Sequence, residues 1–260
     1  MSEATHPLRR LLPALTLLGL IAAWELLVRA AGIPDYTLPA PSRIAQALHD
    51  HGASLAGSWW VTLKITLGAL ALACAGGVLI AAVFALSPTL ERALFPVAVM
   101  LQVTPIVAVA PLILIYVEST AAALLLCAWI VAFFPILSNT VVGLRATDAN
   151  LRDLFRLYRA TQWQRLALLR TPSALPYFLA GLKISGGLSL IGAVTAEMVA
   201  GAAGRDTGLA SRILEASFRT ETPKMFAALT LLVLTGVLIF GATHALSRAL
   251  LRRRDASESD

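Results

Sequence analysis

Few residues in this sequence have the types and spacing that chemistry would need, and those few lie inside apolar stretches. A membrane serine hydrolase would require Ser189 and His244 to face each other as nucleophile and base. Ser189 follows Gly187-Leu188 but has no glycine after it, and no oxyanion donor is evident. No Gly-x4-Gly-Lys-Ser/Thr loop occurs, so the chain lacks a phosphate-cradling motif for ATP hydrolysis. We therefore expect this chain not to be an enzyme.

The cysteines and histidines do not suggest a metal or redox centre. Cys74 and Cys127 both lie within apolar runs, which is typical of packed thiols. The four histidines are scattered and show no metal-ligand spacing. We expect no metal and no cofactor.

The composition is that of an integral membrane protein. Of 260 residues, 58% are hydrophobic and 14% charged, and the mean hydropathy is +0.77. The net charge of +6 does not indicate a nucleic-acid partner, because the basic residues gather in the gaps between apolar runs. The N-terminal apolar run lacks a small-residue cleavage site, so we expect it to be retained.

Apolar runs long enough to cross a bilayer, about 20 residues each, recur along the chain. They lie near 11–31, 62–86, 93–117, 121–142, 177–200 and 225–247. The sequence thus predicts an all-α polytopic membrane protein with about six transmembrane helices. We expect a cytoplasmic N-terminus over 1–10, a transmembrane domain over 11–250, and a tail over 251–260 without regular structure.

The distribution of lysine and arginine predicts the orientation. The basic ends of the chain and the arginine-rich segment 143–176 fall on one side, which places both termini and that segment in the cytoplasm. The segment 201–224 on the other side also carries cations, which is mild evidence against this orientation.

The polar segment 143–176 contains the spacing of an amphipathic helix. Thr147 and Asp148 stand where its N-cap should be. Its apolar face is formed by Leu151, Leu154, Phe155 and Tyr158. Docking onto a partner and lying on lipid headgroups both remain open from periodicity alone.

A second short helix is predicted directly after the first. Thr161-Gln162-Trp163-Gln164 forms a capping box at its start. We expect it to run to about Arg170 and to end at Pro172 and Pro176.

Two outer segments also carry helical patterns. In 32–58, Ser42 is the expected cap of a short amphipathic helix with Ile44, Ala47 and Leu48 on its apolar side. In 201–224, a short interfacial helix is expected after Gly208, ending near Thr222-Pro223.

Polar residues and prolines within the spans indicate a possible solute path. Pro105 and Pro111 should break the third span, and a broken helix is tolerated at mid-depth where it lines a cavity or packs on neighbours. Small residues on the fifth span favour close helix packing. The candidate path residues are Gln102, Thr104, Pro105, Asn139, Ser185, Ser189 and Glu197.

Ionisable residues in spans are functional candidates because a charge in the membrane is costly. We expect Glu25 to pair with Arg29, and Lys64 and Lys183 to snorkel from positions near helix ends. Glu197 is the strongest candidate, either at the outer mouth or as a helix cap; the sequence does not separate the two.

Several segments together resemble the nitrate/taurine/alkanesulfonate branch of ABC-importer permeases. These are LQVTPIVAVAPLILIY, FFPILSNTVVGLR and PSALPYFLAGLK, and the resemblance runs from about Trp60 to Leu250. The segment 143–176 resembles the E-A-A-x3-G-x9-I-x-L-P loop of that family, in a degenerate form. On that pattern Asp153 stands at the Glu, Leu154 and Phe155 at the two Ala, Arg159 at the Gly, Leu169 at the Ile, and Thr171-Pro172 at the Leu-Pro.

The resemblance implies a type I ABC-importer permease fold in the bacterial inner membrane. It implies three protein partners besides membrane lipid: a cytoplasmic ATPase, a periplasmic or lipoprotein solute-binding protein, and a second permease copy, most simply an identical one. The solute would be a sulfonate, nitrate or a pyrimidine precursor; an ATP-independent carrier or channel is the alternative. The implied ATPase-coupling residues are Asp153, Leu154, Phe155, Tyr158, Arg159, Ala160, Thr161, Leu169 and Pro172.

Overall fold

The computed structural model describes residues 7–201 and 207–258, and side chains over 12–201 and 207–252. The first six residues, the stretch 202–206 and the last two residues lie outside the described residues, as do the predictions that fall on them. The elements are helical: α1 Pro7–Ala30, α2 Pro41–Asp50, α3 Gly52–Leu86, α4 Pro88–Val103, α5 Ile106–Tyr116, α6 Thr120–Arg145, α7 Ala149–Leu157, α8 Gln162–Arg165, the π-turn η1 Leu166–Arg170, α9 Thr171–Ala200, α10 Leu209–Phe218 and α11 Thr222–Glu258. The predicted all-α class is confirmed.

Five helices of the described chain are long and apolar enough to cross a membrane. They cover Leu12–Ala30, Gly52–Leu86, Thr120–Arg145, Gln162–Ala200 and Thr222–Arg252. Helices α4 and α5 make a sixth only as a pair, because they are bent by 99° at the break between them. The number of about six spans is therefore confirmed.

The third span is a sharp elbow and not one continuous helix. Thr104 precedes Pro105 and is extended, with φ −66° and ψ 121°, as the residue before a proline prefers. Pro105 then serves as the N-cap of α5. The break predicted at Pro105 is thus confirmed and turns the chain through nearly a right angle, whereas the break predicted at Pro111 is wrong, because Pro111 lies inside α5.

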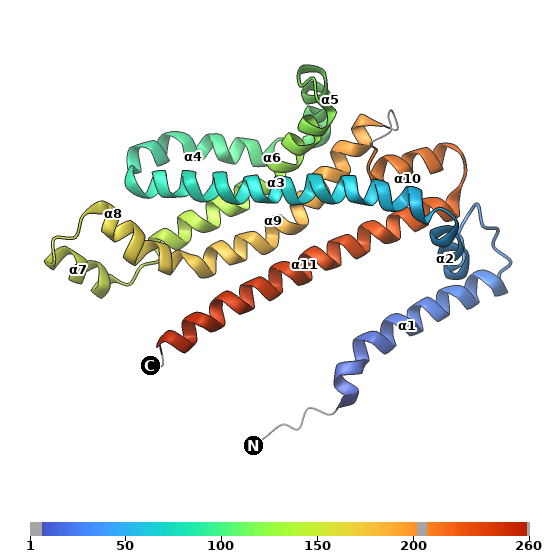
Figure 1. Cartoon of the computed structure of the whole chain (residues 1–260), viewed down its shortest axis with the longest axis horizontal. Helices are drawn as coiled ribbons and strands as arrows, with labels where there is room; N and C mark the ends of the chain where they lie inside the picture. The colour runs from blue at the N-terminus through green and yellow to red at the C-terminus, as the bar shows by residue number, and fades with distance from the viewer. Residues whose placement is uncertain (1–6, 202–206, 259–260) are drawn as a thin grey trace.

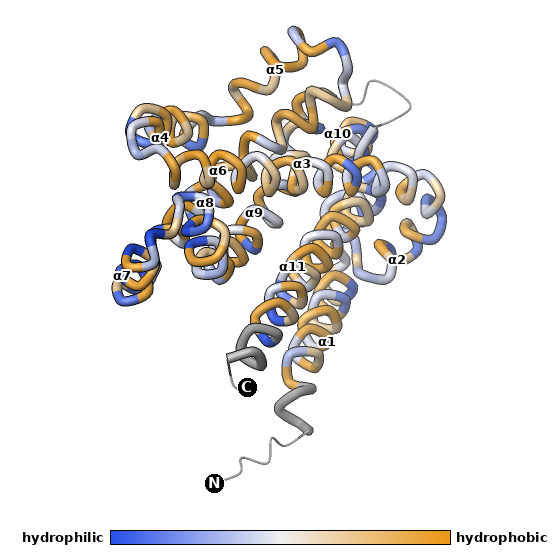
Figure 2. The backbone as a smooth tube through the Cα atoms, turned by 60° about the vertical axis from the view of Figure 1, so that its left-hand side comes forward, coloured by the Kyte–Doolittle hydropathy of each residue, from blue (hydrophilic) through white to orange (hydrophobic). Residues whose placement is uncertain are grey.

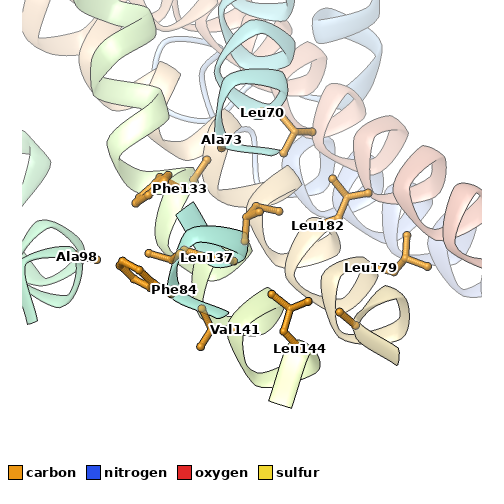
Figure 3. Packing of buried hydrophobic residues seen from close by; sticks show 14 of the residues in the cluster. Leu70, Ala73, Phe84, Ala98, Phe133, Leu137, Val141, Leu144, Leu179 and Leu182 are labelled. Carbon is orange, nitrogen blue, oxygen red and sulfur yellow. The ribbon is translucent and has the colours of Figure 1, made fainter. Parts of the chain in front are cut away.

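Helices α3, α6, α9 and α11 form the body of the bundle, with α6 packed extensively on α3 and α9 (Figure 1). Figure 3 shows part of the core between them, where Leu70, Phe133, Leu137 and Leu182 meet. Lipid tails are as apolar as these side chains, so close packing stabilises such a core more than removal from water does.

Glycines of α9 allow it to pack closely against α6, as the small residues of the fifth span predicted. A Cβ at Gly192 would lie 2.8 Å from Ala128 Cα, and one at Gly181 would lie 2.7 Å from the Pro135 carbonyl oxygen. A Cβ at Gly187 would meet nothing within 4 Å. Gly181 and Gly192 are therefore contact residues, whereas Gly187 faces open space.

The short helices lie at the two ends of the bundle. Helices α7 and α8 lie at the end where α11 finishes, and α2 and α10 lie at the other (Figure 1). In Figure 2 the long helices are mostly hydrophobic, whereas α7 carries a strongly hydrophilic face. The segment 143–176, with α7 and α8, thus forms a polar end of the bundle, and α2 and α10 lie at the opposite end.

Several predicted boundaries are wrong. Helix α3 begins at Gly52 and α11 runs to Glu258, so the second span is longer than expected and most of the C-terminal tail is helical. The short helix α10 is confirmed, but it ends at Phe218, with Arg219 as its C-cap and Thr220 in a left-handed conformation, and Thr222-Pro223 begins α11 instead. Apolar periodicity marks the lipid-facing part of a helix and not its polar extensions, which explains the short estimates.

Candidate functional site

Helix α7 is held at its start by the predicted cap. The Asp148 carboxylate accepts hydrogen bonds from the Asn150 amide at 2.7 Å and the Leu151 amide at 3.4 Å. No residue of α7 is buried. Leu154 is 43% exposed and Tyr158 is 80% exposed, whereas Phe155 is half-buried, so most of the apolar face predicted from the spacing is left uncovered by the described chain.

The turn after α7 has the hydrogen bonds of a Schellman motif. The Ala160 amide donates to the Phe155 carbonyl at 3.0 Å, and the Arg159 amide donates to the Arg156 carbonyl at 2.9 Å. Arg159 has φ +50°, the left-handed conformation for which glycine is the usual residue. Arg159 thus takes the backbone conformation of the glycine that the family pattern has at this place.

The second predicted helix begins where expected but continues past the residue at which it was expected to end. The capping box between Thr161 and Gln164 is present, with bonds of 2.8 and 3.3 Å. The prediction that Pro172 and Pro176 stop this helix is wrong, because α8 continues through the π-turn η1 into α9. The wider π-turn and the Thr171 hydroxyl, which donates to the Leu166 carbonyl at 2.8 Å, accommodate this junction.

The predicted coupling residues differ in their exposure. Asp153 pairs with Arg156 at 3.1 Å on the outside of α7, and the Ala160 carbonyl accepts from Arg165 Nε at 3.1 Å. Leu169 is 5% exposed and packs inside the chain. Most of the accessible candidates therefore lie on α7 and in the turn that follows it; Pro172 is also exposed, at the start of α9, while Leu169 anchors the segment. Contact of these residues with an ATPase stays a prediction.

Two contacts that sequence reasoning missed fasten the segment to the bundle. Arg145 pairs with Glu91 of α4, and Arg170 Nη1 donates to the Ala85 carbonyl of α3 at 2.7 Å. Both join residues far apart in the sequence, and no local spacing signals them. They tie the two ends of the segment to the corner between α3 and α4.

The predicted path residues do not converge on one place. Gln102, Thr104 and Pro105 lie exposed at the α4–α5 elbow, where Thr104 Oγ1 donates to the Met100 carbonyl at 2.7 Å. Asn139 Nδ2 donates to the Pro135 carbonyl at 2.8 Å within α6.

The serines of α9 are occupied by helix packing. Ser185 Oγ donates to the Ala132 carbonyl at 2.6 Å, and Ser189 Oγ donates to the Gly186 carbonyl at 3.0 Å; both serines are fully buried. His244 stacks on Phe240 at 5.9 Å. Among the described residues no hydrogen bond joins Ser189 to His244. A role of the path residues in solute passage stays a prediction.

Glu197 forms the most elaborate polar contact in the bundle. Its side chain is fully buried, with Oε1 accepting from Thr62 Oγ1 at 2.8 Å and Oε2 accepting from the Ala210 amide at 3.0 Å. Thr62 Oγ1 in turn accepts from the Leu209 amide at 2.9 Å. Gly208 has no side chain to cap α10, and a Cβ there would overlap the Glu197 carboxylate. Glu197 therefore caps α10 and joins it to α3 and α9.

Glu25 forms a similar cap at the start of α2. It pairs with Arg29 at 2.6 Å, as predicted, and accepts from the Ser42 amide at 2.9 Å and hydroxyl at 2.8 Å. The prediction that Ser42 caps α2 is wrong, because the N-cap is Ala40 and Ser42 binds Glu25 instead. Sequence spacing could not show that α1 would reach this helix.

The two lysines lie well inside helices. Since α3 begins at Gly52 and α9 continues from Gln162, Lys64 and Lys183 are not near helix ends, and that prediction is wrong. At 1.5 Å per residue, Lys183 lies about 25 Å from the end of α9. Its side chain is half-buried, and its ammonium group forms no hydrogen bond or ion pair with the rest of the described chain. Over the same residues, no group of three or more His, Cys, Asp or Glu could hold a metal ion.

Residues 73–253 match the family described as binding-protein-dependent transport system inner membrane component. The chain belongs to this family. The match covers the bundle from α3 to α11, including the segment 143–176 and the elbow. Resemblance to the permease family, seen first in the sequence motifs, is thus confirmed, and the chain is an inner-membrane component with several transmembrane helices.

Relatives of this permease match over nearly the whole chain. The formylaminopyrimidine transport permease protein ThiX of Halalkalibacterium halodurans is 34% identical over 240 residues, or 92% of this chain and 94% of ThiX. The riboflavin transport system permease protein RibX of Chloroflexus aurantiacus is 33% identical over 241 residues, or 91% and 88%. A solved structure of the MetNI methionine ABC transporter in inward-facing conformations has a TM-score of 0.62 at 20% identity, covering 75% of this chain and 95% of its own, which shows the fold.

Proposed function

We propose that this permease is the transmembrane subunit of an ATP-driven importer and couples to a separate ATPase through the segment 143–176. One observation carries the proposal: α7 is an amphipathic helix with no buried residue and an apolar face turned away from its own chain. A surface of this kind fits a groove on a partner protein. Membership of the binding-protein-dependent family supports an ATPase and a solute-binding protein as partners.

The segment 143–176 is rigid enough to transmit a movement of the ATPase to the transmembrane helices. Asp148 and Thr161 cap α7 and α8, and the Schellman turn fixes the angle between them. Helix α8 then continues into α9, so Gln162–Ala200 is one helical stretch of 39 residues, about 58 Å long. In the proposed cycle, ATP binding draws two such segments together and rocks two copies of the bundle between inward-open and outward-open states.

The proposed orientation places both termini and the segment 143–176 in the cytoplasm. Helices α2 and α10 then face the periplasmic or lipoprotein binding protein. The second copy is proposed to be identical, and solute to pass between the two. We propose a small solute such as a sulfonate, nitrate or a pyrimidine precursor; the motif resemblance supports the first two and the relative ThiX supports the third. Identifying the compound that co-purifies with the cognate binding protein tests this choice.

The test of coupling is a charge placed on the apolar face of α7. Leu154→Asp or Phe155→Asp should abolish co-purification of the ATPase while leaving membrane insertion intact, because a carboxylate would have to be desolvated in the groove. Arg156→Asp puts the same group on the opposite face of α7 and should retain the ATPase. Retention of the ATPase by both apolar-face variants would refute coupling through α7.

Uptake into reconstituted vesicles tests the dependence on ATP. The complete importer should take up solute only with nucleotide and binding protein present. Undiminished uptake without nucleotide would instead identify an ATP-independent carrier or channel.

A further inference from the structure

A cavity lies between the segment 143–176 and the corner where α3 turns into α4. Its volume is about 220 Å³. Phe84, Val141 and Leu144, all nearly fully buried, form an apolar wall. The charged residues that line the same cavity are Glu91, Arg145, Arg152 and Arg170. The lining of the cavity thus combines apolar side chains with three arginines and one glutamate.

The lining of the cavity contains three arginines but only one acidic residue. Glu91 pairs with Arg145. Arg170 donates one hydrogen bond to the Ala85 carbonyl, which carries no charge. Arg152 is exposed, and its guanidinium makes no hydrogen bond or ion pair with any other described residue. Each guanidinium carries five N–H donors, so two positive charges and several donors around the cavity have no carboxylate partner among the described residues.

We propose that this cavity binds a phosphate group, presented by the headgroup of an anionic lipid. Guanidinium groups bind phosphate oxygens through pairs of parallel, charge-assisted hydrogen bonds. The apolar wall beside them accommodates the hydrocarbon that adjoins a lipid headgroup, which inorganic phosphate lacks. Basic pockets between transmembrane helices are a recognised place for anionic headgroups.

A bound phosphate would join three parts of the polar end. Arg145 lies at the end of α6, Arg152 on α7, and Arg170 at the junction with α9. One ligand contacting all three would hold α7 against the bundle, whereas the two polar contacts found among the described residues fasten the ends of the segment. Binding at this cavity does not require the proposed coupling to an ATPase, since no residue of the α7 apolar face lines it.

Native mass spectrometry of the full-length protein in detergent tests the proposal. Phosphatidylglycerol should bind more tightly than phosphatidylcholine, whose phosphate is neutralised by its own cation. Arg152→Gln should weaken phosphatidylglycerol binding about tenfold, the scale of one charge-assisted contact. Arg156→Gln removes the same charge from the same helix outside the cavity and should leave binding unchanged.

Two further arms identify the source of the phosphate and exclude loss of folding as the cause. Displacement of the lipid by millimolar inorganic phosphate would assign the site to soluble phosphate; resistance to it would assign the site to lipid. Glu91→Gln removes the competing carboxylate and should tighten phosphatidylglycerol binding. Equal binding of the two lipids without binding of inorganic phosphate, or an unchanged affinity in Arg152→Gln, would overturn the proposal.

Discussion

Replacing Glu197 should loosen α10 without disturbing the rest of the bundle. In Glu197→Ala the Ala210 amide loses its acceptor inside the protein, and Gly208 supplies no replacement. A buried N–H left without a partner costs about 1–3 kcal/mol. Thr62 still accepts from the Leu209 amide and can redirect its own proton to the Ser58 carbonyl, 3.3 Å away. The expected loss is therefore that of one buried hydrogen bond.

Hydrogen–deuterium exchange over residues 207–218 measures this loss directly. A cost of 1–3 kcal/mol corresponds to exchange about 5- to 150-fold faster when local opening precedes exchange. Peptides from α6 provide the internal reference and should be unchanged. Helix α10 makes its contacts mainly with α9, α11 and α3, so its opening need not unfold the helices around it.

Glu197→Gln separates the hydrogen bonds from the charge. The amide oxygen can still accept from Ala210, and the amide nitrogen can donate to Thr62 Oγ1. Exchange in α10 should stay within about threefold of the wild type, since both hydrogen bonds are kept. Unchanged exchange in Glu197→Ala would refute the capping role, and a glutamine variant as loose as the alanine variant would show that the charge, not the bonding, holds α10.

Three other features of the structure are tested by substitution. Arg159→Gly should slow exchange at the end of α7 by relieving a left-handed non-glycine residue, a gain of about 1 kcal/mol; faster exchange there would contradict the Schellman geometry. Gly192→Ala should lower the thermal stability in detergent by about 1–3 kcal/mol through overpacking against α6, whereas Gly187→Ala on the same helix meets open space and should be neutral or stabilising; equal effects would contradict the close contact. The hydrogen bond from Arg212 lowers the pKa of Glu215 below its usual range. This pair therefore stabilises the protein at neutral pH, and its contribution disappears as the pH falls through the folded-state pKa of Glu215. Glu215→Gln should reduce the loss of stability between about pH 5 and pH 3, and an unchanged pH profile would contradict the assignment.

The features that could be predicted from the sequence are local in the chain. Asp148 and the pair Thr161–Gln164 lie within three residues of the amides that they cap, so their types and spacing determine the structure. The same holds for the amphipathic face of α7 and for the pair Glu25–Arg29, one helical turn apart. The membership of the permease family could also be predicted, because the sequence motifs that resemble the family are short continuous segments.

The contacts that could not be predicted join distant parts of the chain. Glu197 meets Thr62 across 135 positions, and Arg170 meets Ala85 across 85 positions. The packing of α3 against α9 and against η1 brings these groups together, and no sequence spacing encodes it. The continuous helix through Pro172 was missed for a different reason, because a π-turn and nearby hydroxyl groups offset the helix-breaking character of proline.

Helix α1 stands apart from the bundle to which it belongs. Only 6% of its apolar window is buried, and its contacts gather at one end, where Glu25 holds Ser42 and Trp24 lies 6.2 Å from Phe226. The family match begins at residue 73, after this helix. A helix that its own chain buries so little gains most of its stability from insertion into the bilayer, so its removal should cost the remaining helices little of their own packing. The attachment of α1 to the other helices therefore depends mainly on the contacts of Glu25 and Trp24.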